Sequence, residues 1–305
     1  MRNIRFYLFL LIGGACMLMC HSCSRCSRQP AAEDLTIDLA DLVVDTTYVN
    51  MARKAYYALP TPVELSMLIK NSGMVWQPAL LSDPADAVKY LTHQKIALNF
   101  GVYVTDLAYA GLFEQSQTAL RYKRAIQQLA EELGLQSAVD LNTMQQLEAN
   151  INDKDAALRI VSEMYATCMA TLDENERHSL TLAILTGAWV EGMYILTGTI
   201  DEEQPSNESR MKQSVVDQKL TFDVLWLVMS EQKQVPEIAN LLSDLSVLSY
   251  LYGLIAIDQT PNAVTDAADG KTSRIVSSNV SNVTPETYAK IKNQIKILRQ
   301  NFTKK

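Results

Sequence analysis

From Asp45 onward, apolar residues recur at the three- and four-residue spacing of α-helices, and this periodicity constrains the fold most. We find no convincing two-residue alternation, and no Asn-Gly or Asp-Gly hairpin turn between two runs of β-forming residues. The pattern predicts an all-α fold, a single large multi-helix bundle of about ten helices. The last predicted helix is the clearest, because its apolar residues form one stripe: Tyr288, Ile291, Ile295, Leu298 and Phe302.

Capping signals bound these predicted helices. Thr61-Pro62-Val63-Glu64 combines a capping residue, a first-turn proline and a glutamate at the capping-box position. Glycines that follow periodic segments act as stop signals: Gly73, Gly134 and Gly198. The helices are predicted near 45–58, 62–72, 84–92, 94–113, 116–133, 137–151, 154–173, 176–198, 209–231, 236–257 and 285–302.

Two polar stretches interrupt the helical pattern. Residues 201–209 form a short acidic loop, and residues 260–283 are long, polar and weakly patterned. A loop as long as residues 260–283 is either functional or disordered. This stretch lacks aromatic residues that could anchor it, which favours a mobile segment. The alternative is one short strand at Arg274-Ile-Val-Ser-Ser.

Four predicted helices are unusually apolar, and each carries one acidic residue. Helices that are apolar all round are either central in a large bundle or membrane-spanning. A carboxylate near the middle is expensive in lipid, and these segments lack basic flanks, so we predict buried core helices. The segments and their acids are 100–113 with Asp106, 180–197 with Glu191, 219–229 with Asp223 and 238–257 with Asp244.

Asp106, Glu191 and Asp223 are the candidate acid or ligand site. If they converge, burial would raise their pKa values and suit acid–base chemistry or binding of a hard cation. The alternative, which we favour, is structural: buried acids are almost always paired with a cation, a hydroxyl or an indole. Tyrosines and tryptophans on the same helices supply donors.

A weak internal similarity places glycines in two of these helices. Gly101-Val-Tyr-Val-Thr-Asp and Gly187-Ala-Trp-Val-Glu-Gly both put a glycine two residues before an aromatic residue. Glycine inside a helix usually marks close helix–helix approach. We therefore predict that the two helices pack glycine face to glycine face, with Asp106 and Glu191 near the contact.

Other catalytic signatures are not found in the sequence, including zinc-protease, serine-hydrolase, phosphate-loop and dinucleotide motifs. His93 and His178 are interpreted as surface or junction residues, and Cys168, on an apolar stripe, as a small core residue. The sequence therefore predicts no catalytic residues, no metal ligands and no cofactor, and it favours a non-enzymatic protein.

The N-terminus has the order of an export signal. Arg2 and Arg5 precede an apolar run of about 14 residues, which is shorter than a comfortable bilayer span. A cysteine at the processing site is typical of bacterial lipoproteins. Cys23 is the first choice for lipidation, with Cys16 and Cys20 as alternatives. The predicted organisation is a signal over 1–22, a lipidated cysteine and tether over 23–44, and a helical domain over 45–305.

The run Cys20-His-Ser-Cys23-Ser-Arg-Cys26 also fits the spacing of metal-binding cysteines. Three cysteines are an incomplete ligand set, and the run abuts a segment expected to be removed, so the processing interpretation is favoured.

The net charge of the chain limits the classes of partner that we expect it to bind. The net charge is −7 and no cluster of Lys and Arg occurs, which argues against nucleic acid and against electrostatic docking to anionic lipid. The expected partners are the bilayer, through the acyl chains, and an envelope protein.

Three segments carry a resemblance to a known group of proteins. Residues 52–65 (ARKAYYALPTPVEL), 99–110 (NFGVYVTDLAYA) and 187–194 (GAWVEGMY) resemble all-helical lipoproteins of the Bacteroidota, a group with no established activity. In that group, surface export is associated with acidic residues after the lipidated cysteine, whereas Ser24-Arg25-Cys26-Ser27-Arg28 follows here. The resemblance implies a lipoprotein, and the basic residues after Cys23 favour an outer-membrane anchor that faces the periplasm. The export signal, the tether, the large apolar helical core and the lack of a catalytic constellation together predict a binding or scaffold role.

Overall fold

The computed structural model describes residues 59–198, 205–258, 263–266, 273–276 and 280–304. The chain divides into two units, Met1–Val44 and Asp45–Lys305, and every described residue belongs to the second. The predicted signal, the candidate lipidation cysteines, the tether and the helix expected over 45–58 lie outside the described residues.

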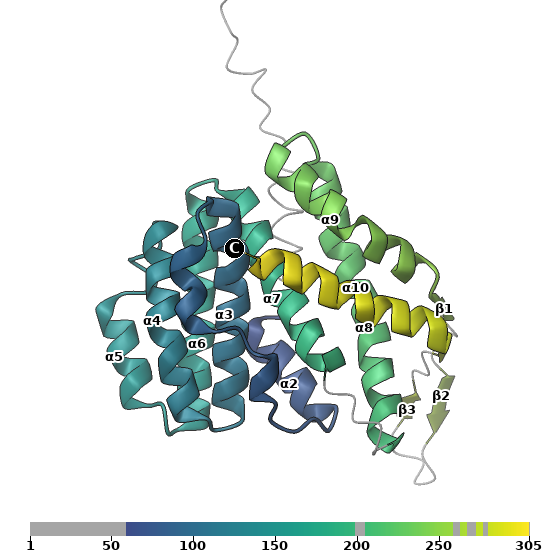
Figure 1. Cartoon of the computed structure of the whole chain (residues 1–305). Coiled ribbons are helices and arrows are strands. Elements are labelled where there is room, and N and C mark those ends of the chain that lie inside the picture. The colour runs from purple at the N-terminus through teal and green to yellow at the C-terminus, as the bar shows by residue number, and fades with distance from the viewer. Residues whose placement is uncertain (1–58, 199–204, 259–262, 267–272, 277–279, 305) are drawn as a thin grey trace, which may run out of the picture. The chain divides into compact units, whose positions relative to one another are not determined.

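The described residues form an all-α multi-helix bundle, as the apolar periodicity predicts (Figure 1). Two short 3₁₀ helices, η1 (Pro78–Leu80) and η2 (Pro84–Lys89), connect the first α-helices. The α-helices are α2 (Pro62–Asn71), α3 (His93–Leu112), α4 (Ser116–Glu132), α5 (Leu141–Ala149), α6 (Lys154–Glu174), α7 (His178–Gly198), α8 (Pro205–Glu231), α9 (Pro236–Gly253) and α10 (Pro285–Thr303).

The predicted helix boundaries follow from local capping chemistry. The Thr61 hydroxyl accepts from the Glu64 N–H at 3.2 Å, and the Glu64 carboxylate accepts from the Thr61 N–H at 2.7 Å. This reciprocal pair is the predicted capping box of α2. Gly73 and Gly134 have φ angles of 85° and 69°, the left-handed conformation that ends α2 and α4. Gly198 is the last residue of α7.

Three boundaries in the helices up to α8 differ clearly from the sequence prediction. The segment predicted as a helix over 84–92 is the 3₁₀ helix η2, which ends at Lys89. The helix predicted from 137 begins at Leu141, because the Asp140 carboxylate caps it by accepting from the Thr143 N–H at 2.7 Å. Helix α8 begins at Pro205, so part of the acidic stretch predicted as a loop is helical.

Helices α3 and α7 form the centre of the bundle and pack closely at two glycines. A Cβ atom on Gly101 would lie 2.2 Å from the Ile184 carbonyl oxygen, and one on Gly187 would lie 2.0 Å from the Leu98 carbonyl oxygen. No side chain fits at such distances, so the two backbones approach each other only because both residues are glycine. The predicted glycine-to-glycine packing is confirmed.

Helix α7 is the one helix among the described residues that is long and apolar enough to cross a membrane, judged by length and composition. Its most apolar window has a mean hydropathy of 1.4, but 83% of that window is buried inside the protein. This burial is typical of a central bundle helix, which is what the sequence predicts for it.

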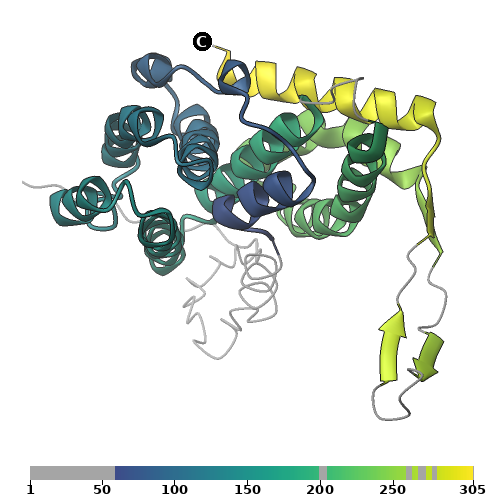
Figure 2. The same cartoon turned by 90° about the horizontal axis from the view of Figure 1, so that it is seen from below.

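Helix α10 packs on α7, α9 and α3 (Figure 2). Its predicted apolar stripe is buried. Its C-terminal end is held by two side chains of α3. The Asn99 amide donates to the Phe302 carbonyl oxygen at 2.9 Å, and the Lys95 ammonium donates to the same oxygen at 3.4 Å. These donors satisfy carbonyl groups that a helix end leaves without intrahelical partners.

Residues 256–282 contain four short strands among the described positions, of which the sequence suggested only one. Helix α9 ends at Gly253 instead of continuing to 257, and two antiparallel pairs follow. The suggested short strand at Arg274 corresponds to β3. The pairs are β1 (Ala256–Asp258) with β4 (Val280–Asn282), and β2 (Ala263–Asp266) with β3 (Ser273–Val276). The prediction overlooked Asp269-Gly270, a hairpin dipeptide that lies between β2 and β3 in the sequence.

Candidate functional site

Asp106 projects from the middle of α3 and is fully buried, with 0% of its surface exposed. Its Oδ2 atom accepts a hydrogen bond from the Ser82 N–H at 3.0 Å. Its Oδ1 atom accepts no hydrogen bond from the described residues. The carboxyl group of Asp106 lies within hydrogen-bonding reach of the Glu191 carboxyl group, so two of the predicted acids do converge.

Glu191 projects from α7 and is also 0% exposed. Its Oε2 atom accepts from Arg299 Nε at 3.0 Å, and its Oε1 atom accepts from Arg299 Nη2 at 3.4 Å. Arg299 comes from α10, and only 15% of its side chain is exposed. The pair is therefore a forked, charge-assisted contact in a largely dry environment.

Ser82 connects the loop between η1 and η2 to this pair. Its hydroxyl accepts from Arg299 Nη2 at 2.7 Å, and its carbonyl oxygen accepts from the Tyr122 hydroxyl at 2.6 Å. Since its N–H donates to Asp106, all three polar groups of Ser82 are used. One loop residue thus joins side chains from α3, α4 and α10.

Aromatic rings enclose the cluster. The guanidinium of Arg299 lies over the Tyr194 ring, 4.8 Å from its centroid. The Tyr103 hydroxyl donates to the Asp83 carbonyl oxygen at 3.0 Å, and the Tyr103 and Tyr122 rings pack 5.9 Å apart. Burial and the nearby carboxylates raise the pKa values of both tyrosines, so both stay neutral.

The charges of the cluster balance only if one acid holds a proton. With both carboxyl groups ionised, Asp106, Glu191 and Arg299 would carry a net charge of −1 in the core. Burial raises the pKa of Asp106 well above its usual range, and the adjacent Glu191 carboxylate raises it further. Arg299 and the Ser82 N–H act in the opposite direction. We infer that Asp106 is neutral beside the Glu191–Arg299 pair.

Asp223, the third predicted member, is not part of this cluster. It lies on the exposed side of α8, where its carboxylate accepts from the Lys219 ammonium at 2.5 Å. Nearly half of its side chain, 48%, is exposed. The prediction that places Asp223 with the buried acids is therefore wrong, because α8 turns this side chain away from the core.

The remaining sequence candidates are structural or exposed. His93 is exposed at the start of α3, and His178 is partly exposed at the start of α7, 3.8 Å from Asp173. Cys168 is 0% exposed, and burial raises the pKa of its thiol to about 12, so the core interpretation is confirmed. Within the described part of the chain, no group of three His, Cys, Asp or Glu side chains could hold a metal ion.

Arg299 and Ser82 are the members that sequence analysis missed. Arg299 follows Ile295 by four residues, so it lies at the edge of the apolar stripe of α10. A cation at that place is a candidate partner for a buried acid, and this signal was available. Ser82 acts chiefly through its backbone, for which the sequence holds no comparable signal.

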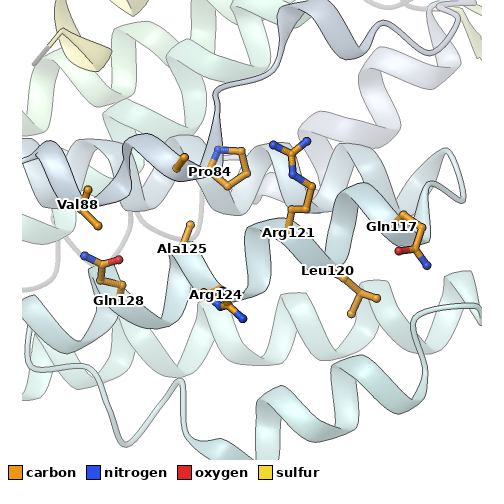
Figure 3. Close-up of a pocket in the computed structure, with 9 residues that line it drawn as sticks. Pro84, Val88, Gln117, Leu120, Arg121, Arg124, Ala125 and Gln128 are labelled. Atoms are coloured by element: carbon orange, nitrogen blue, oxygen red, sulfur yellow. The ribbon is translucent and has the colours of Figure 1, made fainter.

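Neither Asp106 nor Glu191 lines any of three hollows that described residues form. The first lies between η2 and α4 (Figure 3). The second lies where α3, α7 and α9 begin, and the third lies between α7 and α10. The third is lined by Tyr194, whose ring covers Arg299.

Comparisons with models of protein families, with curated proteins and with solved structures found no match to this chain.

Proposed function

We propose that this chain is a lipid-anchored helical protein of the bacterial cell envelope that acts as a binding or scaffold module. One observation supports the non-enzymatic part most strongly. The two acids that could have carried chemistry, Asp106 and Glu191, are 0% exposed, and Glu191 is paired with Arg299. A substrate cannot reach a carboxyl group that has no accessible surface.

The same contacts argue against a cation site. Glu191 already faces a guanidinium at 3.0 Å, and the pKa of Asp106 is raised, which favours its neutral form. A hard cation needs ionised oxygen ligands that it does not share with a resident positive charge. The alternative proposal, an envelope enzyme or small-ligand or metal receptor that uses these acids, would require Arg299 to leave.

This distinction can be tested with cations on the purified full chain. We expect excess Ca²⁺ or Mg²⁺ to leave the melting temperature unchanged in wild type and in Asp106→Asn alike. A rise in wild type that Asp106→Asn abolishes would instead support the receptor proposal.

The anchoring part of the proposal rests on the sequence. Arg2 and Arg5, the apolar run after them and a cysteine at the processing site support export and acylation. The basic residues Arg25 and Arg28 after Cys23 favour an outer-membrane anchor that faces the periplasm. The bilayer is then one partner, and an envelope protein is the other.

Metabolic labelling with a clickable fatty acid tests the anchor. We expect label on the wild-type protein and its loss in one of three variants, Cys23→Ala, Cys20→Ala or Cys16→Ala. Cys168→Ala is the matched control, because this buried cysteine should not affect labelling. Absence of label from wild type, or label that persists in all three variants, would overturn the anchor.

A further inference from the structure

The groove between η2 and α4 has a volume of about 480 Å³ and is open to solvent (Figure 3). One wall comes from η2 and the other from a single face of α4. Its lining residues on η2 are Pro84, Ala85 and Val88, and those on α4 are Gln117, Leu120, Arg121, Arg124, Ala125 and Gln128.

The α4 residues are spaced to form a continuous strip. From Gln117 to Gln128 they recur every three or four residues, which places them along one side of the helix. At 1.5 Å per residue the strip is about 16 Å long. A groove of that length accommodates a short peptide segment of roughly five residues in an extended conformation.

The groove is cationic within an acidic chain. Arg121 and Arg124 are both exposed and both line it, whereas no Asp or Glu does. Arg121 is 65% exposed and forms a 3.4 Å contact with Asp83, itself 60% exposed. Such an exposed pair is weak and is easily exchanged for another carboxylate. Arg124 forms no ion pair with any residue that the structure describes.

Apolar side chains lie beside these two cations. Val88 is 62% exposed on the η2 wall, and Leu120 is partly buried on the α4 wall. A purely polar anion would leave them in contact with water. A segment that also carries aliphatic side chains would cover them, and this favours a peptide over a free anion.

We propose that this groove binds an acidic peptide segment of a partner protein, with carboxylates on Arg121 and Arg124 and aliphatic side chains against Val88 and Leu120. The two arginines are three residues apart on one face of α4, with Cβ atoms about 5–6 Å apart. Carboxylates two residues apart in an extended chain lie about 6.6 Å apart, which the long arginine side chains can span. A flat bilayer meets the rim of a groove and not its floor, so a peptide is the favoured occupant over a lipid surface. This inference rests on the proposed binding role and names its partner class.

Selection from a random 12-residue peptide library on the purified full chain tests the proposal. We expect enriched peptides that combine Asp or Glu with aliphatic residues. The double variant Arg121→Glu/Arg124→Glu should weaken binding of an enriched peptide at least about tenfold, because close charge pairs become repulsive. The same peptide with Lys in place of its acids should regain binding to the double variant.

Arg159→Glu is the matched control, because Arg159 is also 65% exposed but lies on α6. It should bind the peptide as wild type does, and circular dichroism should show all variants folded. Enrichment of basic or uncharged peptides, or equal enrichment on the double variant, would overturn the proposal. The proposal would also be overturned if the protein bound phosphatidylglycerol vesicles through Arg121 and Arg124 but bound no peptide.

Peptide binding in solution does not require the lipid anchor. If the protein binds the peptide but takes up no fatty-acid label, only the proposal of a lipid anchor is overturned. If it is labelled but binds no peptide, only the proposal of a peptide-binding groove is overturned.

Discussion

Arg299 and Glu191 meet at 3.0 Å from α10 and α7, across 108 residues of sequence. The contact fixes the last helix to the centre of the bundle. Because the Glu191 side chain is 0% exposed and that of Arg299 is 15% exposed, each charge depends on the other for solvation.

Removing one partner of this pair should be strongly destabilising. We expect Arg299→Met to lower the free energy of unfolding by about 3–5 kcal/mol, since the Glu191 carboxyl group stays buried without its partner. Urea unfolding followed by circular dichroism measures this. The exposed pair Glu286–Lys290 on α10 is the matched control, and Glu286→Gln should change little. If the substitutions at the buried pair and at the exposed pair changed the free energy of unfolding equally, the Glu191–Arg299 contact would not be the strongly stabilising one.

Asp106 should make stability depend on pH with a particular sign. Its pKa is raised by folding, so the folded state holds a proton that the unfolded state releases above about pH 4. The stability contributed by that proton is complete below the unfolded pKa and is lost as the pH rises through the folded pKa. We expect wild type to lose stability relative to Asp106→Asn as the pH rises from about 4 to 8 in a series of urea titrations. Parallel curves for the two proteins would show that Asp106 is ionised in the fold.

The glycine contact between α3 and α7 should tolerate no side chain. Gly187→Ala would place Cβ 2.0 Å from the Leu98 carbonyl oxygen, so the helices must separate. We expect a loss of about 3 kcal/mol or more, or failure to fold, measured by thermal or urea unfolding. Gly253→Ala is the control, because nothing lies within 4 Å of its added Cβ. That variant should be neutral or stabilised by up to about 1 kcal/mol through helix propensity.

Cys168 should be inert in the folded protein. Its thiol is buried and its pKa is raised to about 12, so almost no thiolate exists at neutral pH. We expect iodoacetamide to label the peptide that contains Cys168 in urea and not under native conditions, as mass spectrometry would show. Rapid native labelling would mean that α6 opens locally.

Much of the bundle can be predicted from the sequence because its determinants are local. Apolar periodicity and capping residues such as Thr61 operate within a few residues, and they define nearly every described helix. The contact between Gly101 and the α7 backbone was also predictable, because a glycine inside an apolar helix usually marks the place where a neighbouring helix comes close.

The site was only partly predictable because its determinants are distant in sequence. Asp106 and Glu191 could be identified as unusual, but the residue that neutralises them lies on α10. Asp223 was misjudged because its partner is close in sequence and was overlooked. Lys219 stands four residues before it, and this local pair is typical of an exposed helix face.

The attachment of α10 has a consequence for how the protein matures. Until α10 is synthesised and docked, the Glu191 carboxylate lacks the Arg299 guanidinium and the Asn99 amide lacks the Phe302 carbonyl oxygen. A chain cut short before Pro285 would therefore hold an uncompensated carboxylate at its centre. A protein without a docked α10 is therefore expected to be loosely packed around Glu191 and open to proteolysis.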